Sequence, residues 1–171
     1  DIDGRPAVGL VLRDSLVVDI AAANRAFERA PAVVSMPMPG DMRALIGRYE
    51  YGVSRRLYEL VNDLVASGRL SGASRPGYVH DLGKVRTLAP ILYPTKMLNA
   101  ASNYYGHVSE ASTPEEQRKV AEARRKDRGT PYLFLKPTVG AIIANGDDIV
   151  LPKGRDKIDW ECELGVVIGR P

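Results

Sequence analysis

The sequence lacks the features that define several common classes of protein. It has a single cysteine, Cys162, which excludes an internal disulfide and suits a reducing compartment. No apolar run reaches the roughly 18 residues that a membrane-spanning helix needs. No stretch has the pattern of a signal peptide, so we expect residence in the cytoplasm without a membrane partner. Aromatic residues make up only 6% of the chain and are not interleaved with basic ones, which argues against nucleic-acid binding.

The chain has enough apolar material for a hydrophobic core and only a mild excess of positive charge. Hydrophobic residues make up 44% of the sequence, and the formal net charge is +3. The length of 171 residues fits one ordinary domain, or a small domain with part of a larger one. The sequence starts at Asp1 and stops at Pro171, directly after a strongly apolar run. Because a core strand needs neighbours, we expect the chain to be a piece of a longer polypeptide.

Residues 1–75 predict a small α/β domain. Two β-prone runs, residues 7–12 and 15–20, are joined by Arg13-Asp14 and predict a hairpin. Apolar spacing and capping signals predict three helices, at residues 21–30, 41–46 and 48–67. In the last of these helices, the pair Arg55-Arg56 is expected to lie on a solvated face.

A second domain is expected over residues 94–171, with residues 76–93 as the linker and connecting strand. Short strands are predicted in it at residues 96–101, 131–137, 141–143 and 149–152. Between the first two, Thr113-Pro114-Glu115-Glu116 has the pattern of a capping box with proline at the first helical position. The helix that follows, to about residue 128, is polar nearly all round, so we expect a surface helix or a mobile lid.

The last apolar run, residues 159–169, carries two glutamates that favour a metal site. Its apolar residues alternate with others, which predicts a β-strand. Glu161 and Glu163 are two residues apart and would project from the same face. Like charges on a partly buried strand disfavour each other's ionisation, and a hard cation such as Mg²⁺, Mn²⁺ or Ca²⁺ removes that cost. The alternative is an edge strand whose two glutamates face water.

A second cluster, from Ser102 to Glu110, favours an acid–base pair. If the chain turns into a helix here, His107 and Glu110 lie at positions i and i+3 on one face. The carboxylate would hold the imidazole in one tautomer and stabilise its protonated form, so that the pair can activate water. An incidental pair on a surface helix is the alternative. The other histidine, His80, is expected to be structural.

A third element is Lys136, at the end of an apolar strand. Its side chain either extends to water or lines a cleft, where it would suit an anionic substrate oxygen. With these three clusters in this order, the chain resembles the fumarylacetoacetate hydrolase family from about Pro94 to Arg170. The resemblance rests on Asn103-Tyr104-Tyr105-Gly106-His107-Val108-Ser109-Glu110, Phe134-Leu135-Lys136-Pro137, Leu151-Pro152 and Glu161-Cys162-Glu163-Leu164.

The resemblance implies an α+β catalytic domain built as a mixed β-sheet roll, here incomplete at its C-terminus, in a homodimer with Mg²⁺ or Mn²⁺ at its centre. It also implies roles for individual residues: metal ligands Glu161 and Glu163, a water-activating pair His107 and Glu110, a substrate contact Lys136, and substrate-binding residues Asn103 and Tyr104. The family's third carboxylate ligand and a further lysine would lie beyond Pro171. Where the family commonly has Gly-Arg before the Asn-Tyr pair, this chain has Ala101-Ser102.

The function that the resemblance implies is metal-dependent hydrolysis of a carbon–carbon bond in acylpyruvate-type 2,4-dioxo acids. Two alternatives stay open. One is isomerisation or decarboxylation of a 2-oxo dicarboxylic acid on the same scaffold. The other is a truncated, non-catalytic module that serves binding or assembly.

Overall fold

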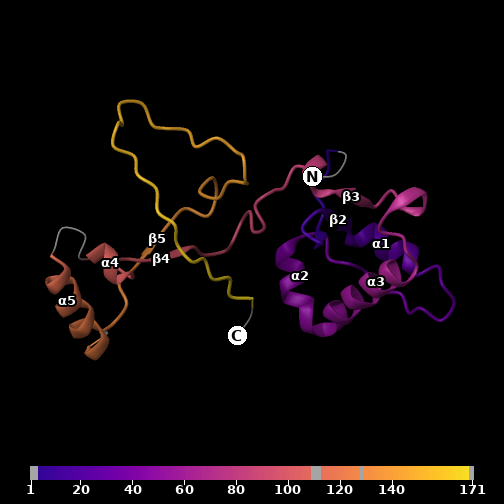
Figure 1. The fold of residues 1–171 in the computed structure, drawn as a ribbon, viewed down its shortest axis with the longest axis horizontal. Coiled ribbons are helices and arrows are strands. Elements are labelled where there is room, and N and C mark those ends of the chain that lie inside the picture. Colours follow the sequence, from indigo (N-terminus) through magenta and orange to yellow (C-terminus); the bar gives the residue numbers. More distant parts are fainter. Residues whose placement is uncertain (1–3, 109–112, 128, 170–171) are drawn as a thin grey trace. The chain divides into compact units, whose positions relative to one another are not determined.

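The computed structural model describes residues 4–108, 113–127 and 129–169 (Figure 1). The chain divides into two compact units. One holds the residues up to Ile91 together with those from Ala144 onward, and the other is Leu92–Ile143. Each unit is a mixture of short helices and small antiparallel sheets. The division into domains at residues 75 and 93 stays a prediction.

A three-stranded antiparallel sheet begins the first unit, with the strand order β1-β2-β3. Strands β1 (Gly9–Leu12) and β2 (Leu16–Asp19) form the predicted hairpin, and β3 (Val79–Asp81) pairs with β2. The turn residues Arg13 and Asp14 have φ values of 53° and 52°. Positive φ at both central positions is the type I′ geometry, whose twist matches that of the two strands. The strand pairing therefore imposes a turn that these two residue types do not favour by themselves.

Side-chain caps start the first two helices, and of the two only the cap at Asp41 is predicted from the sequence. Asp19 accepts a hydrogen bond from the N–H of Ala22 at 3.0 Å and starts α1 (Ile20–Phe27). Asp41 does the same for Ala44 at 2.8 Å and starts α2 (Met42–Arg48). Each cap satisfies one of the N–H groups that a helix start leaves without a partner.

The helix predicted over residues 48–67 is interrupted. A π-helical turn, η1 (Tyr49–Val53), precedes α3 (Ser54–Ala66), and Gly52 inside it has a φ of 93°. A glycine adopts this backbone conformation without a steric penalty. Two short 3₁₀ helices, η2 (Gly72–Ser74) and η3 (Leu82–Lys84), flank β3.

The core of the first unit lies where the two longer helices meet the sheet. Its buried side chains come from β2, α1, α3, the turn after α3, and β3: Val18, Ala23, Leu60, Leu64, Leu70 and Val79. Burying one leucine in such a cluster contributes about 1.5–3 kcal/mol. This cluster holds α1 and α3 together against the sheet.

The second unit contains a two-stranded ribbon and two helices. Strand β4 (Leu98–Ala100) pairs antiparallel with β5 (Leu133–Leu135), so that Leu98 lies opposite Leu135 and Ala100 opposite Leu133. Helices α4 (Tyr105–Val108) and α5 (Pro114–Lys126) lie between the strands in sequence. The capping box of α5 is confirmed, because Thr113 and Glu116 exchange hydrogen bonds between their side chains and backbones. Strand β4 is not part of a buried core, since Leu98 is 55% exposed.

From Ala144 to Gly169 the chain has no regular strand or helix within the part that the structure describes. The strands predicted at residues 149–152 and 159–169 are therefore wrong, as is the one at residues 141–143 in the second unit. Alternating apolar residues favour an extended backbone, but a strand also needs a hydrogen-bonding neighbour, and none pairs with these segments here. Their large side chains are exposed, with Leu164 at 83%. A turn forms at the start of this segment, where Asp147 accepts a hydrogen bond from the N–H of Ala144 at 2.9 Å.

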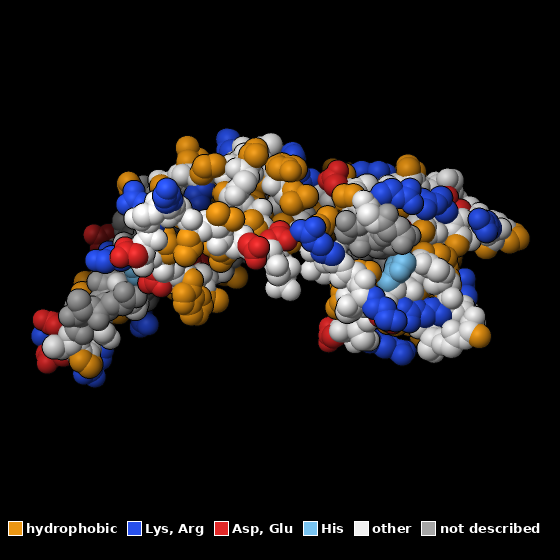
Figure 2. Space-filling model, turned by 90° about the horizontal axis from the view of Figure 1, so that it is seen from above, with side chains coloured by type: hydrophobic (Ala, Val, Ile, Leu, Met, Phe, Trp, Pro, Cys, Tyr) orange, Lys and Arg blue, Asp and Glu red, His pale blue; other side chains and the backbone are white. Residues whose placement is uncertain are grey.

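Hydrophobic and charged side chains share the molecular surface (Figure 2). None of the helices within the described residues has the length and apolar character needed to cross a bilayer.

Candidate functional site

A turn after β4 introduces the first group of predicted site residues. The N–H of Ala101 donates to the carbonyl oxygen of Tyr132 at 2.9 Å, which extends the strand pairing by one residue. Ser102 then adopts a left-handed conformation with a φ of 51°. Asn103 and Tyr104 follow directly, with exposed side chains, and the chain enters α4. The β-ribbon thus ends at the segment to which the sequence assigns substrate binding.

His107 lies in α4 and is exposed. The expectation that the chain turns into a helix at this histidine is confirmed. Its predicted partner, Glu110, lies outside the described residues, so the pairing of these two side chains stays a prediction. His80 is in β3, opposite Val17, and takes part in the sheet as a structural residue would.

Lys136 lies at the other end of the same ribbon. Its N–H donates to the carbonyl oxygen of Met97 at 3.1 Å, and its side chain is exposed. The Met97–Lys136 and Ala101–Tyr132 pairs are four residues apart along each strand. At about 3.4 Å per residue, the two ends of the ribbon are about 14 Å apart along the strands. The backbone of Lys136 is therefore far from the turn at Ser102. The ammonium group of Lys136 can be closer to that turn than its backbone, because the lysine side chain is long.

Glu161 and Glu163 are exposed on the segment without regular structure that follows Ala144. Their carboxylate oxygens are the ligand type that Mg²⁺, Mn²⁺ and Ca²⁺ prefer, so the donor chemistry fits such a cation. Among the described residues, no three histidine, cysteine or acidic side chains lie close enough together to hold a metal ion. The segment that contains the two glutamates is not a strand, so the predicted strand face that would carry both carboxylates is not formed.

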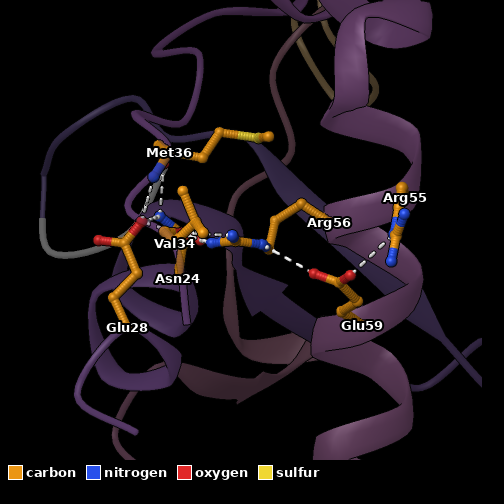
Figure 3. Close-up of polar contacts among 7 residues, drawn as sticks. All are labelled: Asn24, Glu28, Val34, Met36, Arg55, Arg56 and Glu59. Carbon is orange, nitrogen blue, oxygen red and sulfur yellow. Dashed lines mark hydrogen bonds and ion pairs between the residues drawn. The ribbon is translucent and has the colours of Figure 1, made fainter. Parts of the chain in front are cut away.

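The sequence reasoning missed a polar cluster around Arg56 in the first unit (Figure 3). Arg56 is only 5% exposed, and its guanidinium donates to Asn24 Oδ1 and to the carbonyl oxygen of Val34, both at 2.6 Å. It also forms ion pairs with Glu59 at 3.0 Å and Glu28 at 3.4 Å. The guanidinium carbon lies 5.4 Å from the ring centre of Phe27. The expectation of a solvated face is therefore wrong for Arg56.

The neighbouring Arg55 is 85% exposed, as expected for a solvated face. The position of each arginine in the helical repeat explains why Arg56 is buried and Arg55 is exposed. Position 56 lies three residues after Val53 and four before Leu60, and both of these side chains are buried. Arg56 therefore shares the inward face of α3. A buried arginine needs acceptors, and α1 and the loop after it supply them.

Glu28 connects this cluster to the loop that follows α1. Its carboxylate accepts hydrogen bonds from the N–H of Met36 at 2.5 Å and from the Asn24 amide at 3.0 Å. The Met36 hydrogen bond is the main reason that the pKa of Glu28 is below its usual value, and Asn24, Ser35 and the charge of Arg56 act in the same direction. Partial desolvation opposes them. The cluster fixes a loop, and its side chains are engaged with one another in a structural role.

The predicted site residues thus lie on the turn and short helix after β4, at the end of β5 and on a segment without regular structure, in a mixed chain of helices and antiparallel strands. Comparison with known proteins identifies the family. Residues 96–171 match the family model described as "Fumarylacetoacetate (FAA) hydrolase C-terminal". This part of the chain is similar to the fumarylacetoacetate hydrolase family, as the sequence motifs predict.

The curated relatives match over about half of this chain. A protein named "Oxaloacetate tautomerase FAHD2B, mitochondrial" from Homo sapiens is 32% identical over 87 residues, which are 51% of this chain and 24% of that protein. The protein from Bos taurus named "Oxaloacetate tautomerase FAHD2A, mitochondrial" is 33% identical over 87 residues, with the same coverage. An uncharacterized protein of Archaeoglobus fulgidus is 34% identical over 92 residues, which are 54% of this chain and 31% of that protein. The matched stretch is thus about a quarter to a third of the length of these relatives.

Proposed function

We propose that this chain contributes to a metal-dependent enzyme that hydrolyses a carbon–carbon bond in acylpyruvate-type 2,4-dioxo acids. The observation that carries the proposal is the family match over residues 96–171. All of the predicted site residues lie inside this match. The residues that are exposed include His107, Lys136 and both glutamates, so they are accessible to a substrate or a cation.

In this proposal, Glu161 and Glu163 hold a divalent cation, Mg²⁺ or Mn²⁺, with Ca²⁺ as a further candidate. When bound, such a cation acts as a Lewis acid toward the oxygens of a 2-oxo acid. Both glutamates are acceptor-only groups when ionised, and their charge offsets that of the cation. The metal and its ligands are part of the proposal.

His107 acts as the general base, and Glu110 holds its imidazole in the required tautomer. The unprotonated ring nitrogen of His107 takes a proton from water, and the water oxygen forms a bond to the acyl carbonyl carbon. The bond from that carbon to C3 breaks, and its electron pair goes to the enolate of pyruvate. The proton then returns from the imidazolium to C3, which gives pyruvate and a carboxylic acid. General-base assistance of this type contributes a factor of about 10²–10⁴ in rate.

Asn103, Tyr104 and Lys136 bind and orient the substrate. The amide of Asn103 and the hydroxyl of Tyr104 are hydrogen-bonding groups beside α4, and the ammonium group of Lys136 suits a substrate carboxylate. Lys136 lies at the far end of the β4–β5 ribbon, so it would contact the end of the substrate away from the turn at Ser102.

The names of the relatives favour a second candidate function. Two of them are called oxaloacetate tautomerases, and oxaloacetate is a 2-oxo dicarboxylic acid. The same base would then remove a proton from C3 and deliver it to the oxygen on C2, with no bond between carbons broken. Decarboxylation of such an acid is the related alternative. All of these reactions would use the same residues.

The proposal includes the architecture and setting that the resemblance implies. These are a mixed β-sheet roll, a homodimer and cytoplasmic residence. The exposed apolar side chains of β5 and of residues 160–168 support a fold in which further surfaces cover them. The single cysteine supports a reducing compartment, while the mitochondrial relatives make that organelle the alternative.

The experiment that tests the proposal follows the ultraviolet absorbance of the substrate with the full-length protein. Acetylpyruvate and oxaloacetate are each supplied with Mg²⁺ and then with excess chelator. Chelator-sensitive loss of acetylpyruvate, with pyruvate and acetate as products, supports the hydrolase. Chelator-sensitive keto–enol exchange of oxaloacetate alone would shift the assignment to the tautomerase. Activity toward neither acid would leave a non-catalytic binding or assembly module.

A further inference from the structure

Arg124 of helix α5 is hydrogen-bonded to the turn that precedes the predicted site residues Asn103 and Tyr104. The guanidinium of Arg124 donates from Nη1 to the carbonyl oxygen of Ser102 at 3.0 Å. Arg124 belongs to the last turn of α5, and Ser102 is the left-handed residue of the turn after β4. Although 22 residues separate them in sequence, the hydrogen bond fixes one against the other.

The turn at Ser102 needs such support. A residue with a Cβ atom pays a steric cost in the left-handed region, and the conformation persists only when its surroundings determine it. On its strand side the turn is held by the hydrogen bond from Ala101 to Tyr132 at 2.9 Å. On its other side it is held by Arg124. The peptide that joins Ser102 to Asn103 therefore has its carbonyl oxygen fixed from α5.

The position of α5 is not explained by apolar burial. No residue of this helix is buried, although its N-terminus has a capping box and its last turn has three basic residues that suit the helix dipole. A polar helix that buries nothing depends on specific polar contacts for its placement. The Arg124 hydrogen bond is a contact of this kind, and it ends on the residue just before Asn103.

We infer that Arg124 is a positioning residue, which holds the Ser102 carbonyl and thereby orients Asn103, Tyr104 and the start of α4. This inference rests on the proposed function, because it assigns Arg124 to the same site. Arg124 acts through the backbone of the turn and does not touch the substrate. A displacement of α5 would release the turn and lower the activity of the site.

The sequence offers a direct spectroscopic test of this hydrogen bond. Ser-Asn occurs once in the 171 residues, at positions 102 and 103. Protein labelled with ¹³C at serine carbonyls and ¹⁵N at asparagine thus gives one carbonyl-to-amide signal from this chain, that of the Ser102–Asn103 peptide. The variants are Arg124→Ala and Arg124→Lys, and Arg118→Ala on the same helix is the control. Turnover of acetylpyruvate and oxaloacetate is measured in the full-length protein with the same substitutions.

The inference expects Arg124→Ala to move the Ser102 carbonyl signal and to lower kcat by about tenfold, with the Mg²⁺ dependence unchanged. Arg124→Lys should recover part of both effects because lysine keeps a donor, and Arg118→Ala should show neither. An unmoved signal in Arg124→Ala would overturn the inference whatever the activity. A moved signal with full turnover would also overturn it. If the wild-type protein converts neither acid, the proposed function fails, and the effect of Arg124 on turnover fails with it. A moved signal in Arg124→Ala would in that case still show that Arg124 fixes the Ser102 carbonyl.

Discussion

Residues 7–81 and residues 131–169 use similar apolar side chains and reach opposite outcomes. In the first region, Leu64 is 2% exposed in a cluster that draws on two strands and two helices. In the second, leucine, valine and isoleucine side chains with the same β-forming pattern are mostly exposed, along β5 and from Ile149 to Ile168. In the first region, the apolar faces of the sheet and of helices α1 and α3 pack against one another. The second region carries Lys136, Glu161 and Glu163 on segments that lack such packing partners within the described residues.

We therefore expect one region to determine the stability of the molecule and the other to carry its proposed catalytic residues. The packed region holds the buried arginine cluster and the hydrophobic core. The region with the family match holds the residues to which catalysis is assigned. Substitutions in the two regions should therefore affect different measurements, and matched pairs of residues make this comparison sharp.

The two histidines are the first matched pair and give the largest expected effect. His107→Ala should lower turnover by about 10²–10⁴, the factor that a general base contributes. His80→Gln, in the packed sheet, should leave turnover within about twofold, because His80 is assigned no part in the reaction. Steady-state kinetics of both full-length variants, with Mg²⁺ in excess, make the comparison. Retained activity in His107→Ala would remove the base from the mechanism.

The second pair is Leu64 and Leu164, which receive the same substitution. Leu64→Ala should lower the free energy of unfolding by about 2–5 kcal/mol, because it leaves a cavity in the core. In the 171-residue chain, where Leu164 is exposed, Leu164→Ala should change it by less than about 0.5 kcal/mol, as is usual for such a position. Urea denaturation followed by circular dichroism measures both. A loss at Leu164 as large as that at Leu64 would show that the C-terminal run is buried in solution.

The third pair is the neighbouring arginines of α3. Arg56→Met should destabilise the protein by about 3 kcal/mol, because Glu28 and Glu59 lose the partner that compensates their charge. Arg55→Met removes only an exposed i, i+4 ion pair with Glu59, worth about 0.3–0.5 kcal/mol. The same denaturation experiment applies. Equal effects at the two positions would contradict the burial of Arg56.

The smallest effect concerns the dependence of stability on pH. The pKa of Glu28 is lowered, mainly by the Met36 N–H, so the folded state binds a proton to this group less readily than the unfolded state does. The stabilisation is present above the ordinary pKa of a glutamate, about 4.3. It is lost as the pH falls through the lowered pKa of the folded state. Glu28→Gln should therefore be less stable at neutral pH, with a shallower loss between about pH 5 and pH 3.

Thermal unfolding at a series of pH values tests this expectation, with Glu122→Gln as the control because Glu122 is an exposed residue of α5. Asp81 and Asp147 also have a pKa below the usual value, through hydrogen bonds to Arg75 and to the N–H of Ala144, respectively. Some acid sensitivity should therefore remain in Glu28→Gln. An unchanged pH profile in that variant would contradict the role of the Met36 hydrogen bond.

Local signals in the sequence predict the packed region well. The cap at Asp41 and the hairpin around Arg13-Asp14 form as expected, as does the capping box at Thr113 in the second unit. Each depends on residues that are close in sequence, so the pattern contains most of the information. The cap at Asp19 is not predicted, because the sequence assigns Asp19 to the preceding strand. The break at Gly52 and the burial of Arg56 depend on what α3 packs against, which periodicity alone does not provide.

The strand that carries Glu161 and Glu163 shows where sequence reasoning stops. An alternating pattern states which face is apolar, but the hydrogen bonds of a strand come from a neighbour that the pattern does not identify. The family of the site was nevertheless predictable, because the spacing within Asn103 to Glu110 and within Glu161 to Leu164 is specific as a combination. The individual roles of these residues stay predictions.

The metal dependence of the proposed site is the central claim, and a binding titration tests it without knowledge of the substrate. Mn²⁺ is added to the full-length protein and the free ion is followed by electron paramagnetic resonance, for the wild type and for the double variant Glu161→Gln, Glu163→Gln. The account predicts one ion bound per chain in the wild type, and binding at least tenfold weaker in the double variant because both carboxylate ligands are lost. Equal affinity in the two proteins would contradict the assignment of these glutamates as metal ligands.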